Sequence, residues 1–328
     1  MSITCDCLVF AAKNKVEVQK LTLPDVGAGE IGVKTLYSGV SIGTELWILI
    51  EKYWCAKYPN IPGYQKVGRV EKVGAGVTNY REGDIVFLRT TKIASDIEPM
   101  WAGHTSYSVM PADETYMFRL PEGIDPVEAS LLCIPAVGYH GAAEVMPINQ
   151  GDTVAVIGVG MIGQFSAQTA MLAEAKVIAV DMLNDRLQYA SKYAQATTFN
   201  PTEVDVDAEI KKLCPDGLDA VIDTSANAKA VNQSFNWLKA KGRYCFQGYY
   251  PTETPIDFLQ PHIKELVMYN PTDSTPQGAA RCAQYIAEKK MHIKEMISRT
   301  ISFGQAPELY DELVAGNKEI LAAVIDWR

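Results

Sequence analysis

The sequence predicts an α/β protein that combines a mostly β part with a doubly wound parallel sheet. Two observations predict this fold class: strand-like runs dominate up to about residue 120, and strand-like and helix-like runs alternate from about residue 125 onwards. Such alternation is typical of a parallel sheet with helices on both faces. The length of 328 residues agrees with two domains, because a domain contains roughly 150 residues.

The first part consists of short β-type runs that are separated by turn residues. Runs of this kind favour strands. A helix is expected after the third run, over residues 44–54. The predicted strands are residues 4–10, 16–21, 31–37, 66–73 and 84–89.

The second part begins near residue 125. Residues 153–157 form a short continuous apolar run, as expected for a strand that is buried on both faces. Residues 200–217 are polar and acidic, and predict a surface loop with one helical turn or more. The predicted helices are residues 126–132, 136–145, 161–173, 184–193, 228–238 and 275–289. The predicted strands are residues 153–157, 176–180, 220–223, 242–247 and 321–327.

Composition and charge narrow the classes of function. The chain is 48% hydrophobic and 21% charged, which is typical of a globular protein. Its net charge of −9 argues against broad binding to nucleic acid or anionic membranes. No apolar run approaches the roughly 18 residues of a membrane helix, and the first residues lack the basic segment of a secretory signal. The seven scattered cysteines are not a disulfide framework, so we expect reduced thiols and a cytoplasmic protein.

The strongest local signal is the segment TVAVIGVGMIG at residues 153–163. It predicts a strand, a Gly-x-Gly-x-x-Gly turn and the start of a helix, which is the context of a dinucleotide-binding site. The first glycine permits the tight turn, the second lets the backbone approach a pyrophosphate, and the third allows close helix–strand packing. The helix N-terminus then faces the phosphates. The predicted cofactor contacts are Gly158, Gly160, Met161, Ile162 and Gly163.

Asp181 lies 18 residues beyond Gly163, at the end of the next predicted strand. A carboxylate there accepts hydrogen bonds from ribose hydroxyls and repels a 2′-phosphate, so it favours NAD(H) over NADP(H). Met182 follows directly and is included in the predicted cofactor site. Arg186 is close enough in sequence to leave NADP(H) open. The alternative is a glycine-rich turn that binds another nucleotide or none.

Residues 39–43 (GVSIG) match the local form of a hydrolase nucleophile elbow, with Ser41 at its centre. Only β-type runs precede this segment, whereas an α/β-hydrolase has alternating strands and helices before its elbow. We therefore favour a strand-to-helix turn that lines a cleft. Metal binding is also poorly supported, because the chain has four histidines and neither a C-x-x-C nor an H-E-x-x-H motif.

Several segments occur together in an order typical of one enzyme family. They are SGVS after the third strand, IPGYQKVGRV at 61–70, VGAGVTNYREGDIV at 73–86, RLPEGIDPVEASLLC at 119–133, and the GVGMIG turn. With these segments the chain resembles the zinc-type medium-chain dehydrogenase/reductase superfamily over nearly its whole length. The resemblance implies a GroES-like catalytic domain (1–133 and 290–328), a Rossmann domain (134–289), and a cofactor in the cleft between them. The SIGTE segment and the ending ILAAVIDWR look closest to the bacteriochlorophyllide a dehydrogenase subgroup.

The sequence departs from this family at the zinc sites. Zinc-dependent members hold the catalytic ion with a Cys, the His of a G-H-E motif, and a later Cys or Glu. Ser41 occupies the first position, Tyr64 and Gln65 replace the His and Glu, and Cys133 alone persists. A catalytic zinc needs about three protein ligands, and residues 88–103, where the structural-zinc lobe would lie, contain no cysteine. We therefore predict a zinc-free enzyme in which Cys133 is a small apolar filler.

A zinc-free site needs hydrogen-bond donors to stabilise a developing alkoxide. The groups in the lost metal site are Tyr64, Ser41 and Thr44. Tyr64 is the first candidate, because a phenol donates to oxygen and can shuttle a proton; the alternative is a ring that fills the void. Ser41 and Thr44 either hydrogen-bond the substrate or the nicotinamide ribose, or serve as strand-end and helix-cap residues. Glu45 and Gln65 either orient these groups or satisfy local backbone.

Two histidines are secondary candidates. His140 begins a predicted helical segment and could relay a proton near neutral pH, as could His104; a packed or exposed histidine is the alternative for each. Trp101, Tyr53 and Trp54 either line an apolar substrate pocket or belong to the core, which we favour.

By the same resemblance, Ser225, Gly248 and Tyr249 follow later Rossmann strands, where relatives contact the nicotinamide half of the cofactor. The sequence therefore predicts an NAD-dependent, zinc-independent alcohol dehydrogenase or ketone reductase with a small-to-medium substrate. A zinc-free enoyl or quinone reductase with NADPH and a non-catalytic nucleotide-binding protein remain the alternatives. A homodimer is expected, because relatives extend their sheets across subunits at the strand near residues 267–270. No nucleic-acid or membrane partner is expected.

Overall fold

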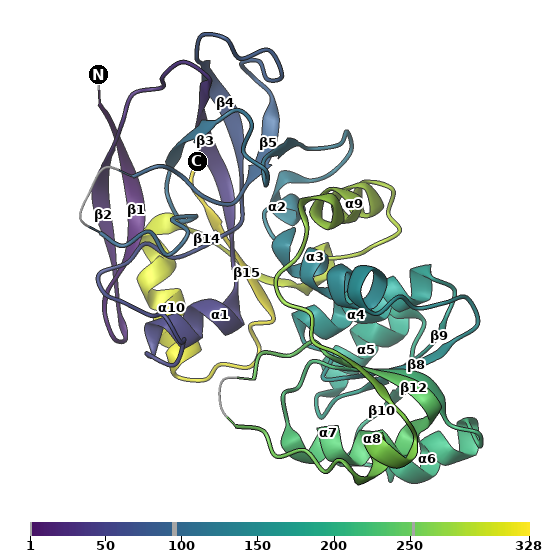
Figure 1. The fold of residues 1–328 in the computed structure, drawn as a ribbon. Helices are drawn as coiled ribbons and strands as arrows, with labels where there is room; N and C mark the ends of the chain where they lie inside the picture. The colour runs from purple at the N-terminus through teal and green to yellow at the C-terminus, as the bar shows by residue number, and fades with distance from the viewer. Residues whose placement is uncertain (1, 94–96, 251–252) are drawn as a thin grey trace. The chain divides into compact units, whose positions relative to one another are not determined.

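The computed structural model describes residues 2–93, 97–250 and 253–328. The chain divides into two units, which are coloured along the sequence in Figure 1. Unit 1 contains the residues up to Cys133 together with Ala283–Glu288 and Ile293–Arg328. Unit 2 contains Ile134–Cys282 and Lys289–His292. The structure thus groups residues 283–288 with unit 1, and the division of the chain into domains at 133 and 290 stays a prediction.

Unit 1 is built mainly from antiparallel strands. A hairpin of β1 (Ile3–Ala12) and β2 (Lys15–Leu23) forms one small sheet. The main sheet has the order β14-β15-β3-β4-β5-β7, and β6 pairs with β3 outside this path. Its strands are β3 (Glu30–Val40), β4 (Lys66–Val73), β5 (Ile85–Leu88), β6 (Tyr107–Pro111), β7 (Phe118–Arg119), β14 (Ile297–Ser302) and β15 (Ala322–Asp326).

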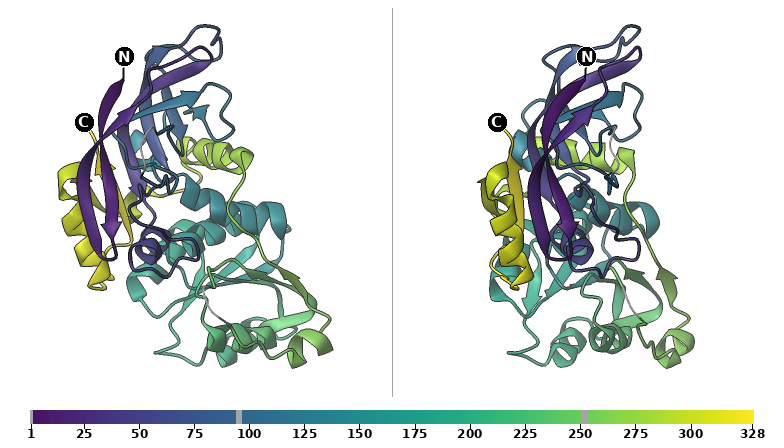
Figure 2. Two further views of the ribbon diagram at one scale, coloured as in Figure 1. Left: turned by 60° about the vertical axis from the view of Figure 1, so that its left-hand side comes forward. Right: turned by 90° about the vertical axis from the view of Figure 1, so that its left-hand side faces the viewer.

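Short helices cover this sheet and complete the core of unit 1. The apolar faces of α1 (Ile42–Leu49) and α10 (Ala306–Val314) bury Ile48, Leu309 and Tyr310 in one cluster with residues of β1, β3 and β15. Figure 2 shows α10 beside the β1–β2 hairpin in both views. Unit 1 also contains α2 (Pro126–Ala129), η3 (Lys294–Met296) and η4 (Phe303–Gln305). The chain leaves β3 directly into α1, which places Ser41 and Glu45 at the carboxyl end of a central strand.

Unit 2 contains a six-stranded sheet in the order β10-β9-β8-β11-β12-β13, in which all strands are parallel. Its strands are β8 (Thr153–Ile157), β9 (Lys176–Val180), β10 (Thr197–Phe199), β11 (Leu218–Asp223), β12 (Leu238–Phe246) and β13 (Val267–Tyr269). Its helices are η1 (His140–Val145), α4 (Met161–Leu172), α5 (Asn184–Ala194), α6 (Val206–Leu213), α7 (Ala228–Ser234), η2 (Phe235–Trp237) and α8 (Leu259–Ile263). Two further helices, α3 (Cys133–Tyr139) and α9 (Pro276–Ala287), contain residues of both units.

The sheet of unit 2 is covered on both faces. Val154 and Val156 of β8 pack in one cluster with α4 and α5, whereas Ala155 and Ile157 pack in another with α6 and α7. Since neighbouring residues of a strand point to opposite faces, this division requires apolar side chains at every position, as the continuous run in the sequence predicted. Figure 1 shows α4 and α5 on one side of the sheet and α6 and α7 on the other. The α/β fold class with a doubly wound sheet is confirmed.

Several predicted boundaries are wrong. The helix expected at 44–54 begins at Ile42 and ends at Leu49, because Glu51 adopts a left-handed conformation with φ of 60°. The helix expected at 136–145 is an α-helical segment followed by a π-helix, η1. The helix expected at 126–132 ends at Ala129, and the strand expected at 242–247 begins earlier, at Leu238. Among the residues that the structure describes, no helix is both long and apolar enough to cross a lipid bilayer.

Candidate active site and cofactor site

The glycine turn of unit 2 lies between β8 and α4. Gly158 has φ of 77°, a conformation that glycine adopts without strain. A Cβ on Gly163 would lie 2.0 Å from the carbonyl oxygen of Gly158, so the helix can approach the turn only with glycine there. The nearest atom to a Cβ on Gly160 would be the Arg186 guanidinium, at 3.7 Å, which leaves space for a ligand beside the backbone. Gly160 caps α4, whose N-terminus can receive an anion.

Asp181 follows β9 and is fixed against this turn. Its Oδ2 accepts the backbone N–H of Val159 at 2.8 Å, and its Oδ1 accepts that of Leu183 at 2.9 Å. Each carboxylate oxygen can accept further hydrogen bonds, so Asp181 can also bind a ribose diol. Arg186 Nη1 lies 3.9 Å from Asp181 Oδ2 and places a cation beside it. The turn, the helix N-terminus and this carboxylate together fit a dinucleotide.

The remaining cofactor candidates lie at the start of α4 and after β9, β11 and β12, and they vary in exposure. Met161 and Ile162 form the first turn of α4. Met182 is 65% exposed beside Asp181. Ser225 follows β11, and Gly248 and Tyr249 follow β12, the next strand of the sheet. Tyr249 is 47% exposed.

In unit 1, the phenol of Tyr64 is hydrogen-bonded to both of the other hydroxyl candidates. The Tyr64 phenol donates a hydrogen bond to Ser41 Oγ, and the Thr44 side chain is a second partner of the phenol. Burial raises the pKa of the Tyr64 phenol far above its usual value, and the hydrogen bonds to Ser41 and Thr44 oppose that shift only in part. Tyr64 therefore stays protonated and can act as a hydrogen-bond donor. Ser41 is the N-cap of α1, and its hydroxyl pairs with the phenol instead of the helix backbone.

Aromatic side chains surround Tyr64. The ring of Trp101 makes an edge contact with it, with centroids 5.3 Å apart, and Tyr53 contacts Trp101 at 6.2 Å. The Arg89 guanidinium lies 5.4 Å from the centre of the Tyr64 ring. Trp54 is 81% exposed, so the expectation that it belongs to the core is wrong. Tyr53 and Trp101 pack partly buried against the core of unit 1.

A network of buried polar side chains fixes the backbone of Ser41. Glu45 Oε1 accepts the backbone N–H of Ser41 at 2.8 Å, and Glu45 Oε2 accepts the phenol of Tyr310. His104 Nε2 lies 2.9 Å from Glu45 Oε2, and its Nδ1 lies 2.8 Å from Ser38 Oγ. The side chains of Glu45, His104 and Tyr310 are fully buried. These donors stabilise the carboxylate in the absence of water, so His104 has a structural place in the core of unit 1.

The positions that the family resemblance assigns to zinc ligands are occupied by Ser41, Tyr64 and Cys133. Ser41 and Tyr64 are hydrogen-bonded to each other. Gln65 accepts the backbone N–H of Cys133 at 3.1 Å, and the Cys133 thiol donates to the carbonyl of Tyr64 at 3.3 Å. Hydroxyls are not typical zinc ligands, and the single thiol falls short of the roughly three protein ligands of a catalytic zinc. Within residues 2–93, 97–250 and 253–328, no group of three His, Cys, Asp or Glu side chains could hold a metal ion.

His140 belongs to unit 2 and makes a different arrangement. Its Nδ1 lies 2.6 Å from Glu144 Oε2, and Thr275 Oγ1 donates to Glu144 Oε1 at 2.8 Å. The pair occupies the π-helix η1, a rare conformation that is frequent at functional sites. His140 and the Tyr64 cluster are thus carried by separate units.

The partners that fix these groups are absent from the sequence-based prediction. Tyr310 lies 265 residues from Glu45, and Tyr250 lies 27 residues from the Asp223 carboxylate that it binds. No local motif marks either pair. The one available signal was Asp223 itself, an acidic residue that directly follows the apolar residues 220–222.

Two family models match the chain. The model of the alcohol dehydrogenase GroES-like domain matches residues 27–122, and that of the zinc-binding dehydrogenase matches residues 161–285. An alcohol dehydrogenase of Moraxella sp. strain TAE123 is 30% identical, over 74% of this chain and 77% of its own length. A D-xylulose reductase A of Aspergillus niger is 28% identical, over 82% of each chain.

Solved structures share the fold. An alcohol dehydrogenase of Escherichia coli CFT073, solved with NADH, has a TM-score of 0.84 and 18% identity over 98% of this chain and 99% of its own. A protein of Sinorhizobium meliloti 1021, solved with NADP, has a TM-score of 0.84 and 24% identity over 99% of both chains. At these identities the likeness concerns the fold.

Proposed function

Because this chain belongs to the zinc-type medium-chain dehydrogenase/reductase superfamily, in which its relatives are alcohol and polyol oxidoreductases, we propose that it is a zinc-independent, NAD(H)-dependent enzyme that interconverts a secondary alcohol and a ketone. The observation that carries this proposal is the hydrogen-bonded cluster of Tyr64, Ser41 and Thr44, which includes two of the positions that the family resemblance assigns to zinc ligands. The proposal assigns cofactor binding to unit 2 and polarisation of the substrate to unit 1.

In the reductive direction, the Tyr64 phenol donates a hydrogen bond to the substrate carbonyl oxygen and stabilises the negative charge that develops there. The glycine turn and Asp181 would hold the nicotinamide cofactor, which would supply hydride for the carbonyl carbon when bound. The phenolic proton passes to the resulting alkoxide, which completes the alcohol. Ser41 and Thr44, which already hydrogen-bond the phenol, donate to the phenolate oxygen and support its reprotonation from solvent. In the oxidative direction these steps reverse.

The preference for NAD(H) follows from Asp181. Its carboxylate is held beside the glycine turn by two backbone N–H groups, where it accepts the ribose hydroxyls and repels a 2′-phosphate. Arg186 is the opposing influence, because its guanidinium lies 3.9 Å from that carboxylate. The pairing keeps the arginine engaged with Asp181 and thereby weakens its attraction for a 2′-phosphate.

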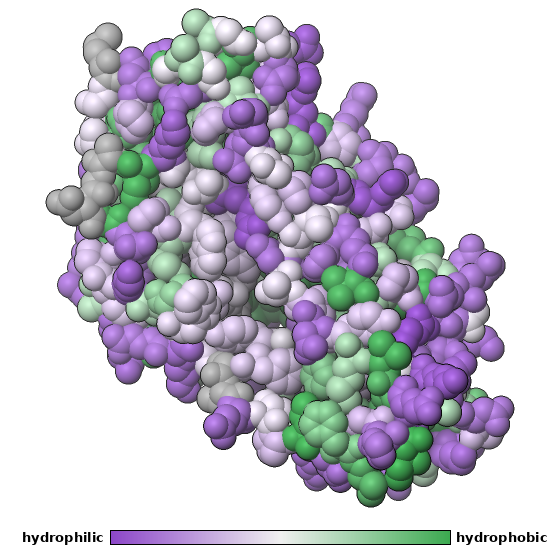
Figure 3. Space-filling view, in the orientation of Figure 1, coloured by the Kyte–Doolittle hydropathy of each residue, from purple (hydrophilic) through white to green (hydrophobic). Residues whose placement is uncertain are grey.

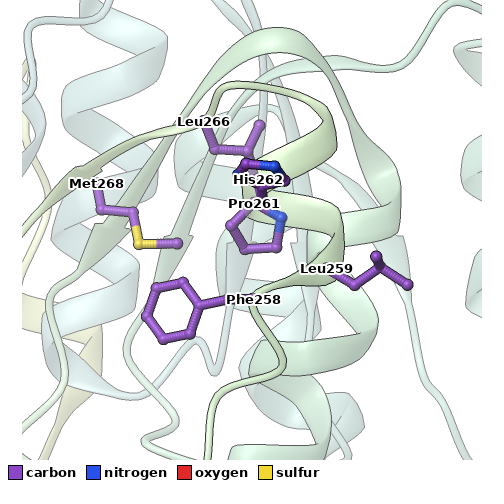
Figure 4. Close-up of a pocket in the computed structure, with 6 residues that line it drawn as sticks. All are labelled: Phe258, Leu259, Pro261, His262, Leu266 and Met268. Carbon is purple, nitrogen blue, oxygen red and sulfur yellow. The ribbon is translucent and has the colours of Figure 1, made fainter.

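We also propose that the edge of β13 in unit 2 binds a second copy of the chain. β13 ends the sheet and leaves one row of backbone groups for another strand. Around it, Phe258, Leu259, Ile263 and Val267 are 45–63% exposed, and Figure 3 shows hydrophobic residues gathered on this end of unit 2. Phe258, Pro261 and Met268 are among the residues that line a hollow of about 460 Å³, and Figure 4 shows how their side chains lie. Val267→Lys is therefore expected to convert a dimer to a monomer in light scattering, and a wild-type monomer would contradict the proposal.

The decisive experiment combines a cofactor titration with an activity screen. Wild-type protein is titrated with NADH and NADPH by fluorescence, and then assayed with a panel of secondary alcohols and ketones. We expect tighter binding of NADH and turnover of a panel member without added metal. NADH binding without any turnover would instead support the non-catalytic alternative. An absence of binding to either nucleotide would contradict the proposed function as a whole.

A further inference from the structure

Asp223, the last residue of β11, binds the two loops that follow β11 and β12. Its side chain is fully buried. Oδ1 accepts the hydroxyl of Ser225 at 2.6 Å, and Oδ2 accepts the backbone N–H of Ala226 at 3.0 Å. Oδ2 also accepts the phenol of Tyr250, which comes from the loop after β12. One carboxylate therefore fastens both loops.

The backbone of Asp223 reinforces this connection. Its carbonyl oxygen accepts the N–H groups of Gln247 and Gly248, each at 2.9 Å. The loops are also in direct contact, because a Cβ on Gly248 would lie 3.2 Å from the backbone nitrogen of Ala226. The loop after β12 is thus tied to Asp223 by two backbone hydrogen bonds and by the Tyr250 phenol.

The first of these loops is held in a costly conformation. Ala226 has φ of 52°, in the left-handed region where a residue with a Cβ is strained by about 1–2 kcal/mol. Strain of this kind persists where surrounding contacts impose it, and it gathers at ligand sites. The hydrogen bond from Ala226 to Asp223 supplies such a contact. On the other side, the Thr224 hydroxyl donates to the carbonyl of Gly158, which fastens the same loop to the glycine turn.

The position of these loops in the sheet indicates what they receive. β8 and β9 carry the glycine turn and Asp181, and β11 and β12 follow β8 in the sheet order. In an open parallel sheet, ligands bind beyond the carboxyl ends of the strands. A dinucleotide whose adenosine half lies at Asp181 therefore extends towards the ends of β11 and β12. Ser225, Gly248 and Tyr249 lie in the two loops there.

We propose that Asp223, acting with Tyr250, is a positioning residue that fixes the two loops receiving the nicotinamide half of the cofactor. This inference rests on the proposed function and adds to it a division within the cofactor site. Asp181 governs the adenosine half, and Asp223 governs the half that carries the hydride. A carboxylate suits this role because its partners, two hydroxyls and a backbone N–H, can all donate to it. An asparagine would direct an NH₂ group at one of them.

The test compares two ligands that share only one half of the site. NADH contains both halves, whereas ADP lacks the nicotinamide riboside. Asp223→Asn is expected to raise the Kd for NADH about 10-fold, equivalent to about 1.4 kcal/mol, and to leave the Kd for ADP within about twofold of wild type. Tyr250→Phe is expected to have a smaller effect in the same direction. Tyr244→Phe is the matched control, because it deletes a buried hydroxyl that bonds Ser234 within the same unit.

The possible outcomes distinguish a failure of this inference from a failure of the proposed function. Equal losses of NADH and ADP affinity would indicate a merely structural role and overturn the proposal, as would wild-type NADH affinity in both variants. Wild-type protein that binds neither ligand would overturn the proposed function and this inference with it. If thermal unfolding shows that Asp223→Asn does not fold, Tyr250→Phe decides the question, because it retains the carboxylate and its hydrogen bonds to Ser225 and Ala226.

Discussion

Replacing Tyr64 with phenylalanine removes one oxygen atom from the centre of the candidate site. The phenol donates to Ser41, and its ring makes an edge contact with Trp101 at 5.3 Å. The ring contact survives the substitution, so the fold around it should persist. Ser41 also keeps its backbone hydrogen bond to Glu45 at 2.8 Å, which holds the start of α1. The expected change is therefore confined to the loss of a donor.

The size of the effect follows from the role assigned to that donor. Removing one donor that stabilises a developing oxyanion costs about 100- to 1000-fold in kcat, or about 3–4 kcal/mol. The loss concerns the transition state, so the KM for NADH should stay within about twofold of wild type. The assay is the decrease in NADH absorbance with a ketone that the wild-type enzyme reduces.

A matched control is Tyr80→Phe in the same unit. The Tyr80 phenol donates to the carbonyl of Met117 at 3.0 Å and lies in a different cluster. This variant should retain the wild-type kcat. A kcat for Tyr64→Phe within about threefold of the control would show that Tyr64 only fills space, and the donor argument would be refuted.

Three further outcomes are expected. Asp181→Ala should raise the ratio of kcat/KM for NADPH to that for NADH by about 10-fold or more, because a repulsive charge is removed and Arg186 loses its partner; an unchanged ratio would remove Asp181 from cofactor selection. Dialysis against a chelator should leave turnover unchanged, and elemental analysis should find well under one zinc per chain, whereas stoichiometric zinc lost together with activity would contradict zinc independence. Burial lowers the pKa of Lys66 from 10.5 to about 7, so between these values the unfolded chain binds one proton more than the folded chain. The free energy of unfolding should therefore rise with pH across this window, by up to about 1.4 kcal/mol per pH unit. Lys66→Met should remove that part of the rise in denaturant unfolding measured at both ends of the window, and parallel curves for the two proteins would contradict the shift.

The sequence correctly predicted those elements whose surroundings require a recognisable pattern of neighbouring residues. The bounds of β8 and β9 match the predicted strands, because a strand buried on both faces is apolar at every position. The end of α1 was missed, since the left-handed residue that follows it is Glu51 and not a glycine. The glycine at position 141 of the π-helix η1 is required by a distant neighbour. A Cβ on Gly141 would overlap Gln247, which lies 106 residues further along the chain.

The candidate site likewise contains residues that the local sequence predicts and residues that it does not. The glycine turn and Asp181 form a contiguous pattern whose spacing reflects a strand, a turn and a helix, so the sequence contains them. The neighbours of Tyr64 could be identified only through the family resemblance, since the segments that carry Ser41 and Tyr64 lie 23 residues apart. The Tyr310 and Tyr250 contacts result from tertiary packing alone. Hydrogen bonds of this kind depend on which distant elements pack together, and periodicity contains no information about that.

The electrostatics around Tyr64 bear on the proton transfer that is proposed for it. A zinc ion stabilises an alkoxide and so favours loss of the alcohol proton. In this chain the opposite influences surround the phenol: burial raises its pKa, and the nearby Glu45 carboxylate raises it further. Inside the core of unit 1, the Glu45 carboxylate accepts the Ser41 backbone N–H and the Tyr310 phenol, and its Oε2 lies 2.9 Å from His104 Nε2. If Tyr64 is the acid, its proton is therefore held firmly until an alkoxide, a stronger base than the phenolate, forms beside it. In reduction that alkoxide forms from the ketone, and in oxidation the reverse transfer starts from the phenolate, which the hydrogen bonds to Ser41 and Thr44 stabilise in part.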